Sequence, residues 1–413
     1  MKVTTLQHCR CCNSELLSTL FSLGDQHLTG VFPKQGEAHP PKAPLALTLC
    51  EDCGLVQLAH SCSPEFLYGP TYGYRSGLNG SMRDHLKRTA DYLTSYLQLQ
   101  SGDVVCDIGC NDGTLLKYFV TEGLQRIGID PLAEKFREFH PEGLLICSDF
   151  FTRESFEKTS SRPAKLITSL SMFYDLEDPL AFVRDINSCL TDDGIWFFEQ
   201  SYLWLMLKTN SFDTICHEHL EYYSLNVIEF ILRQAGMKIV DLSLNNVNGG
   251  SMAVTSAKAN NSRSITPRAA NLLEDEKSFG LVDPATYKAF IGRCTNYGHE
   301  LKEKIAEIKL RGLNVAGYGA STKGNVLLQY LGLTEQDLPF ILEINKDKKG
   351  CVTPGSNIPI RLEDEVDILA IDYLVVFPWH FRDGIIEKEK DFINAGGRFI
   401  FPLPVMEIFP AEQ

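Results

Sequence analysis

A buried acid followed by two glycines has the clearest chemical potential in this chain. An apolar stretch, residues 104–106, leads into Asp107, and Gly109 and Gly113 follow it. This order predicts a strand, a tight turn and the start of a helix. Glycine permits positive φ and lets the backbone come close to a ligand. The spacing Asp-x-Gly-x-x-x-Gly lacks the G-x-G-x-x-G of a dinucleotide phosphate loop, so the expected ligand carries no pyrophosphate.

Two further acids follow the next short apolar stretches, at Asp130 and Asp149. An acid one βαβ step after the glycine turn is placed to accept the two ribose hydroxyls. Asp149, beside an aromatic ring, suits an adenine amino group. S-adenosylmethionine has no phosphate and an ammonium group that needs a carboxylate, so we predict it as the cofactor. The alternative is an ordinary α/β core with acids in its loops. The candidate cofactor-binding residues are Asp107, Gly109, Asn111, Gly113, Thr114, Asp130, Asp149 and Phe150.

The first seventy residues contain two cysteine knuckles, Cys9-x-x-Cys12 and Cys50-x-x-Cys53. Paired knuckles of this kind supply four thiolates to a tetrahedral zinc ion. Cys11 is an extra thiol that could exchange with Cys12 as a ligand. A redox pair is the competing interpretation, but such a motif occurs singly beside a βαβ unit. We therefore predict a structural zinc ion, whose four protein ligands leave no open position for chemistry.

A second chemical centre is the run His217, Glu218 and His219. A zinc-peptidase helix needs its histidines four residues apart, whereas these are two apart and would point in different directions. A general base, with Glu218 orienting or polarising a neighbouring imidazole, fits the spacing better. The plain alternative is a polar loop with satisfied histidines.

Three loops could contact a substrate. Residues 68–77 are rich in glycine and tyrosine, residues 248–251 form a glycine turn, and residues 315–325 form a second strand, glycine turn and helix. The last turn is no Walker loop, because an asparagine follows Lys323 and Gly324, but its N–H groups and Lys323 could hold a diphosphate. The candidate substrate-binding residues are Tyr72, Gly250, Ser251, Ser321, Lys323 and Asn325.

Composition excludes several classes of partner. A net charge of −14 argues against nucleic acid, since phosphate contacts need a surplus of Lys and Arg. The sequence has no apolar run long enough to span a membrane, and its first residues resemble no secretory signal. Thirteen cysteines then indicate thiols and metal in a reduced compartment, so we expect a cytoplasmic protein that acts on a small molecule. The sequence sets no oligomeric state.

The elements that position these residues alternate between strand and helix. Strands are expected at residues 104–108, 165–170 and 194–200, with helices between them, which predicts a parallel sheet covered on both faces. Ligands then sit outside the carboxyl ends of the strands. With 413 residues, the chain is expected to form a zinc-binding domain at 1–70, a methyltransferase domain at 71–257 and a second Rossmann-like domain at 258–413, all in an α/β protein.

In this order, the motifs resemble the sugar C-methyltransferases that act on nucleoside-diphosphate-linked deoxy sugars. The likeness covers nearly the whole chain: the cysteine knuckles, the turn at 107–114, His-Glu-His at 217–219, Gly-Gly-Ser at 249–251 and Gly-Tyr-Gly-Ala at 317–320. It implies that His219 is the base, that Glu218 and Tyr74 lie in the sugar pocket, and that the C-terminal domain helps to hold the nucleotide.

The chain departs from this family at two positions. Cys216 stands where the family usually has tyrosine, and the segment around Met172 lacks a histidine that the family often has. Both positions belong to the expected sugar-binding site. We therefore predict C-methylation of a nucleotide-linked 4-keto deoxy sugar, with Tyr74, Tyr222 and His217 stabilising the oxyanion. The rival functions are O- or N-methylation on the same scaffold and a non-catalytic nucleotide-sugar-binding module.

Overall fold

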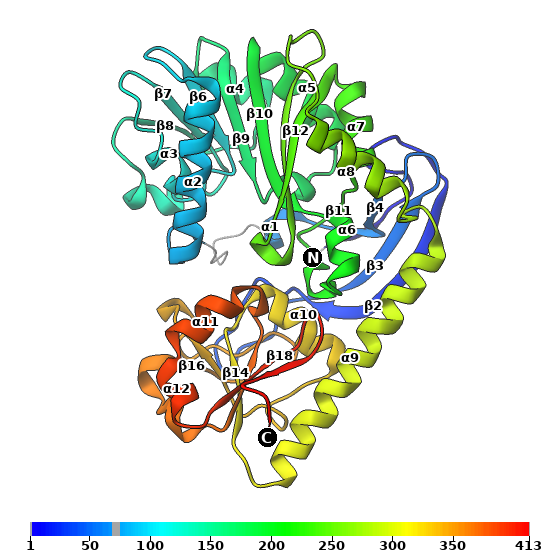
Figure 1. The fold of residues 1–413 in the computed structure, drawn as a ribbon, viewed down its shortest axis with the longest axis vertical. Coiled ribbons are helices and arrows are strands. Elements are labelled where there is room, and N and C mark those ends of the chain that lie inside the picture. The colour runs from blue at the N-terminus through cyan, green and yellow to red at the C-terminus, as the bar shows by residue number, and fades with distance from the viewer. Residues whose placement is uncertain (1, 68–74, 413) are drawn as a thin grey trace.

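The computed structural model describes residues 2–67 and 75–412. Figure 1 shows two α/β units, with the N-terminal strands running between them and helix α9 along one side. One cluster of buried apolar side chains extends through all three parts, from Cys9 to Leu403. Within the described residues, no helix combines the length and the apolar character needed to cross a lipid bilayer.

The central unit is built on a seven-stranded sheet of order β12-β13-β10-β9-β6-β7-β8. β13 runs antiparallel to both of its neighbours, and the other pairs are parallel. This arrangement confirms the predicted α/β class and brings the ends of β6, β7 and β8 side by side. The strands are β6 (Val104–Ile108), β7 (Gln125–Ile129), β8 (Leu144–Cys147), β9 (Ala164–Leu170), β10 (Leu190–Ser201), β12 (Met237–Asn245) and β13 (Ser251–Lys258).

The helices of this unit begin at polar caps and bury one apolar stripe. In α2, for example, Asn79 accepts a hydrogen bond from the backbone N–H of Ser81, and Leu86 and Leu93 are among its buried residues. The helices are α2 (Gly80–Leu97), α3 (Thr114–Lys117), α4 (Arg153–Thr159), α5 (Pro179–Cys189), α6 (Leu203–Lys208), α7 (Leu225–Gln234) and α8 (Pro267–Lys277). Helix α8 is anchored to β12, because Arg268 binds the Asp241 carboxylate at 2.5 Å.

The N-terminal unit contains a four-stranded sheet of order β11-β4-β3-β2 and a two-stranded sheet of β1 and β5. Its edge strand β11 (Glu221–Tyr222) comes from the segment directly after His219 and pairs with β4. The zinc-binding unit therefore shares a sheet with residues 212–224, which carry the predicted base His219 and which we call the catalytic segment. Its own elements are β1 (Val3–Thr5), β2 (Leu17–His27), β3 (Lys42–Cys50), β4 (Val56–Leu58), β5 (His60–Cys62) and α1 (Pro64–Leu67).

The C-terminal unit is a second open sheet, of order β16-β15-β14-β17-β18-β19, in which only the β18–β19 pair is antiparallel. Strand order reverses at β14, so the loops after β14 and β17 flank the place where such sheets bind ligands. The elements are α9 (Pro284–Leu310), β14 (Val315–Tyr318), α10 (Thr322–Leu331), β15 (Ile341–Glu343), β16 (Ile360–Leu362), β17 (Tyr373–Val376), α11 (Arg382–Lys388), α12 (Lys390–Asn394), β18 (Arg398–Phe401) and β19 (Glu407–Phe409).

Hydrogen bonds join the N-terminal and C-terminal units directly. Asn325 Nδ2 donates to the backbone oxygen of Thr29 at 2.7 Å, and the Gln329 side chain bonds both backbone groups of His27. Helix α10 thus holds the loop that follows β2, and the three units meet around the segment that carries His219.

Candidate active site and cofactor site

The glycine turn after β6 has the backbone that its sequence predicts. Gly109 and Gly113 have φ of +71° and +72°, values that a Cβ would make costly. The N–H of Asn111 donates to Asp130 Oδ2 at 2.9 Å, and the N–H of Leu132 donates to Asp130 Oδ1 at 2.7 Å. Asp130 therefore ties the turn to the end of β7, where the sequence places the ribose.

Asp107 is a buried carboxylate whose surroundings suit a cationic ligand. It is 4% exposed and accepts a hydrogen bond from the Thr168 hydroxyl at 2.7 Å. Burial, opposed by this hydrogen bond, raises the pKa of Asp107 to about 7, and the charge of Asp130 adds to the rise. Asp107 forms no ion pair with any residue that the structure describes. The ammonium group of S-adenosylmethionine would supply the missing positive charge, so these residues fit that cofactor.

The third acid lies at an open edge of the sheet. Asp149 accepts the N–H of Phe150 at 2.8 Å, and the Phe150 side chain is 56% exposed, which leaves its ring free to pack on a base. Thr114 instead caps the turn, because its hydroxyl donates to Asp112 Oδ1 at 2.6 Å.

The end of the tyrosine-rich loop is fastened to the cofactor turn. The N–H of Ser76 donates to Asn111 Oδ1 at 3.0 Å, and the N–H of Gly77 donates to Asp112 Oδ2 at 2.9 Å. Tyr72 and Tyr74, the predicted pocket residues of this loop, lie outside the described residues. The anchored end places the loop's attachment point beside the candidate cofactor site.

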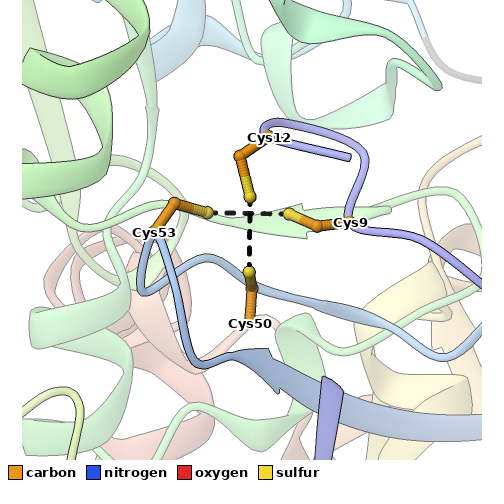
Figure 2. A group of neighbouring side chains, drawn as sticks. All are labelled: Cys9, Cys12, Cys50 and Cys53. Atoms are coloured by element: carbon orange, nitrogen blue, oxygen red, sulfur yellow. Dashed lines mark hydrogen bonds between the residues drawn. The ribbon is translucent and has the colours of Figure 1, made fainter. Parts of the chain in front are cut away.

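The four predicted zinc ligands come together. The Sγ atoms of Cys9, Cys12, Cys50 and Cys53 all lie within 4.8 Å of one another, and Figure 2 shows them pointing at a common centre. The Cys9–Cys53 and Cys12–Cys50 sulfurs are 3.6 and 3.5 Å apart. A tetrahedral zinc ion with bonds of about 2.3 Å requires sulfurs about 3.8 Å apart, so the cluster fits zinc. Cys11 lies outside this group of four.

A buried arginine connects the zinc knuckle to the catalytic segment. The Arg10 side chain, only 1% exposed, donates to the backbone oxygen of Leu58 at 2.8 Å, and its Nε lies 3.9 Å from the carboxylate of Glu221. Glu221 is two residues beyond His219 and is itself buried. The sequence shows Arg10 only as a residue inside a cysteine knuckle, so no local signal marked this connection.

His219 has the hydrogen bond that a neutral base requires. Its Nδ1 lies 2.9 Å from the backbone oxygen of Thr214, which only accepts, so Nδ1 carries the proton and Nε2 keeps its lone pair. Burial, and then the charge of Lys323, lowers the pKa of His219 to about 3. The Tyr174 ring packs against the imidazole, with centroids 4.2 Å apart. The imidazole is therefore neutral at pH 7 and held in one orientation.

The neighbours of His219 take up different positions from one another. His217 is 1% exposed and points at the zinc-binding unit, where its Nε2 lies 3.0 Å from the backbone oxygen of Ala43. Burial raises the pKa of Glu218, opposed by hydrogen bonds from the Cys216 thiol and the backbone of Gly30. The sequence suggested that Glu218 orients a neighbouring imidazole, but the group that binds His219 Nδ1 is the backbone oxygen of Thr214. Tyr222 shares a cavity of about 10 Å³, the size of one water molecule, with His219 and Glu221.

Among the predicted substrate residues, Lys323 is close enough to His219 for its charge to lower the pKa of the imidazole. Its ammonium group donates to the backbone oxygen of Asn248 in the turn before β13. Ser321 caps α10 by accepting the N–H of Gly324 at 3.0 Å, and Ser251 donates to the backbone oxygen of Val247 at 2.8 Å. Asn325, as described above, binds Thr29. Gly250, at φ +131°, leaves no space for a Cβ against Leu205.

One polar cluster in the structure was not predicted from the sequence. His85 Nε2 lies 2.7 Å from Glu199 Oε1, and Asn245 Nδ2 donates to Glu199 Oε2 at 2.7 Å. The three side chains line a cleft of about 270 Å³ between α2 and the outer strands of the central sheet. They come from segments more than 45 residues apart in sequence, so no local pattern predicts this cluster.

The strand order and the acids at three successive strand ends define the class of protein, a methyltransferase dependent on S-adenosylmethionine. Family models agree along the chain: a zinc binding domain matches residues 9–68, a methyltransferase domain residues 74–242, and a C-methyltransferase C-terminal domain residues 246–404. The chain is 31% identical over 415 aligned positions to C-methyltransferase NovU of Streptomyces niveus, with 100% of this chain and 99% of the relative covered. The chain therefore belongs to the C-methyltransferase family.

More distant matches cover less than half of the chain. A tRNA U34 carboxymethyltransferase of Campylobacter lari is 29% identical over 119 residues, which span 27% of this chain and 40% of the relative. The magnesium protoporphyrin IX methyltransferase of Synechocystis, a structure with bound S-adenosylhomocysteine, aligns with 45% of this chain and 90% of its own at 17% identity and a TM-score of 0.33. The fold assignment rests on the strand order and the family models.

Proposed function

We propose that this C-methyltransferase acts on a nucleoside-diphosphate-linked 4-keto deoxy sugar, and that His219 removes the carbon-bound proton beside the ketone. The observation that carries the proposal is the neutral imidazole with its lone pair on Nε2, held by Thr214 where the three units meet. Carbon attached to hydrogen is a poor nucleophile, so a C-methyltransferase needs such a base, whereas many hydroxyl and amine substrates do not.

Each unit contributes a different group to this reaction. Asp107 holds the ammonium group of the cofactor, and Asp130 holds its ribose. S-adenosylmethionine, when bound, supplies an electrophilic methyl group. His219 Nε2 accepts the substrate proton, and Thr214 keeps the imidazole in the required tautomer. The zinc ion of the four cysteines positions the N-terminal unit, whose strand β4 pairs with β11 directly after His219.

A nucleotide-linked substrate is supported by the second open α/β sheet. The loop after β17 reaches the catalytic segment, because Trp379 Nε1 donates to Asp213 Oδ2 at 2.9 Å. The loop after β14 leads into α10 and Lys323, next to Asn248. Loops at such a switch point are where open α/β sheets bind nucleotides, so a nucleotide held there would extend its sugar toward His219. The abundance of thiols supports a cytoplasmic location.

Transfer of a labelled methyl group to a panel of nucleotide-linked 4-keto sugars tests the proposal. Mass spectrometry and NMR should find the label on the carbon beside the ketone. A label on oxygen or nitrogen would replace C-methylation of this substrate by the rival chemistry. Absence of S-adenosylmethionine binding in calorimetry would favour a non-catalytic binding module.

A further inference from the structure

Lys323, in the first turn of α10, directs its ammonium group from the C-terminal unit toward the catalytic segment. Its Nζ donates to the backbone oxygen of Asn248. It is also close enough to His219 and His380 for its charge to lower the pKa of both imidazoles, second to the effect of burial. Helix α10 packs against residues 212–214, and Thr214 of that segment accepts the hydrogen bond from His219, so the C-terminal unit brings a cation to the neighbourhood of the predicted base.

The partner of Lys323 is linked in turn to the cofactor side of the site. Asn248 Nδ2 donates to Ser171 Oγ at 3.2 Å, just after the end of β9. The next residue, Met172, packs so closely on Gly109 that a Cβ there would lie 3.2 Å from Met172 Cγ. These contacts connect the ammonium group of Lys323, through Asn248 and the segment Ser171–Met172, to the glycine turn after β6.

Burial lowers the pKa of Lys323, and the charge of Asp213 opposes this decrease. Asp213 is fully buried, and its carboxylate accepts a hydrogen bond from Trp379 Nε1. An ammonium group has three N–H donors, and within the described residues Lys323 uses one, for Asn248. Two donors remain for an incoming oxygen.

We propose that Lys323 stabilises the enolate oxygen of the substrate when His219 removes the neighbouring carbon-bound proton. This role rests on the function proposed above. The carbon–hydrogen bond breaks, and the proton passes to His219 Nε2. Its electron pair forms the carbon–carbon double bond, and the π pair of the ketone moves onto oxygen, where the negative charge meets the ammonium group. The step needs no oxidant or reductant. The diphosphate contact predicted from the sequence is the competing role for Lys323.

Hydrogen exchange without methyl transfer distinguishes the two roles. The protein is incubated in deuterated water with S-adenosylhomocysteine and a thymidine-diphosphate-linked or uridine-diphosphate-linked 4-keto deoxy sugar, and deuterium beside the ketone is measured by NMR. Lys323→Met should slow exchange at saturating substrate by about 10²–10³-fold, the usual cost of a lost oxyanion donor. Lys323→Arg should recover at least about tenfold of that loss, because the charge returns. Affinity for free thymidine or uridine diphosphate should stay within about twofold.

Lys348→Met is the matched control, because Lys348 donates to the backbone oxygen of Ala320 at 2.6 Å in the same glycine turn. Its exchange rate should stay close to that of the parent. Parent-like exchange in Lys323→Met overturns the proposal, and so does a loss of diphosphate affinity with unchanged exchange at saturation. Failure of the proposed function looks different: the parent protein itself would then exchange no deuterium, and the role of Lys323 would fall with it.

Discussion

His219 Nδ1 and the backbone oxygen of Thr214 are 2.9 Å apart, and this contact fixes which imidazole nitrogen can act as a base. A backbone oxygen keeps this tautomer regardless of pH, because it does not itself titrate in the physiological range. Glu218, the neighbour that the sequence suggested for this task, instead accepts hydrogen bonds from Cys216 and Gly30. The base is thus oriented by its own loop, while the zinc-binding unit holds the adjacent glutamate.

Replacement of the base should greatly slow enolate formation. In deuterated water with S-adenosylhomocysteine and a 4-keto sugar nucleotide, His219→Ala should slow deuterium exchange by about 10²–10⁴-fold while cofactor affinity stays nearly unchanged. His299→Ala, which alters an exposed histidine on α9, is the control and should exchange like the parent. Full exchange in His219→Ala would move the base to another residue.

Cofactor affinity should depend on the protonation of Asp107. Because its pKa is about 7 in the free protein, Asp107 is mostly protonated at pH 5.5, and binding of an ammonium group then requires loss of that proton. The association constant for S-adenosylhomocysteine should therefore rise by roughly tenfold between pH 5.5 and 7. Isothermal calorimetry would measure it. Asp107→Asn should bind more weakly and without this pH dependence, and a flat profile in the parent would refute the assignment.

The zinc cluster should depend on its second knuckle and tolerate loss of Cys11. Cys50→Ser/Cys53→Ser removes two of the four thiolates and should lose the metal, with destabilisation of the N-terminal unit, since a structural zinc site contributes directly to folding. Cys11→Ser is the matched control and should keep one zinc ion per chain. Elemental analysis of the purified variants measures the zinc content. A lower zinc content in Cys11→Ser would mean that Cys11 serves as a zinc ligand.

Acid should destabilise the protein partly through His217. Burial lowers the pKa of His217 to about 4, below its usual value of 6.5, so below pH 6.5 the unfolded chain binds a proton that the folded chain does not. Stability from this residue is complete above pH 6.5 and declines as the pH falls toward 4. Urea unfolding should show that His217→Gln, which can keep the contact with Ala43, loses about 2 kcal/mol less than the parent between pH 7.5 and 5. Equal losses in the two proteins would contradict this.

The cofactor site could be predicted from sequence because its signals are local. Asp107, Asp130 and Asp149 each follow an apolar run, and the βα alternation places those runs in adjacent parallel strands. The spacing of the four cysteines in two C-x-x-C pairs likewise predicts a tetrahedral zinc site. Both predictions depend only on residue spacing and on the periodicity of apolar residues along the chain.

The substrate side could not be predicted in the same way, because its contacts join distant segments. The sequence predicts Asn325 as a substrate-binding residue, but its side-chain amide donates to the backbone oxygen of Thr29 in the N-terminal unit. The Arg10–Glu221 pair and the His85–Glu199 pair likewise depend on how strands pair and domains dock. The residues around each partner show no local pattern that predicts these contacts.

The hydrogen bond from Asn325 to Thr29 spans 296 positions of the chain. During translation, the loop after β2 therefore leaves the ribosome long before its partner helix exists. At synthesis rates of about 5–20 residues per second, the delay is roughly 15–60 s. Through that time the nascent N-terminal unit lacks the contact that closes the site, while its cysteines are free to take up zinc. Metal uptake can thus precede assembly of the catalytic centre, which must await the last third of the polypeptide.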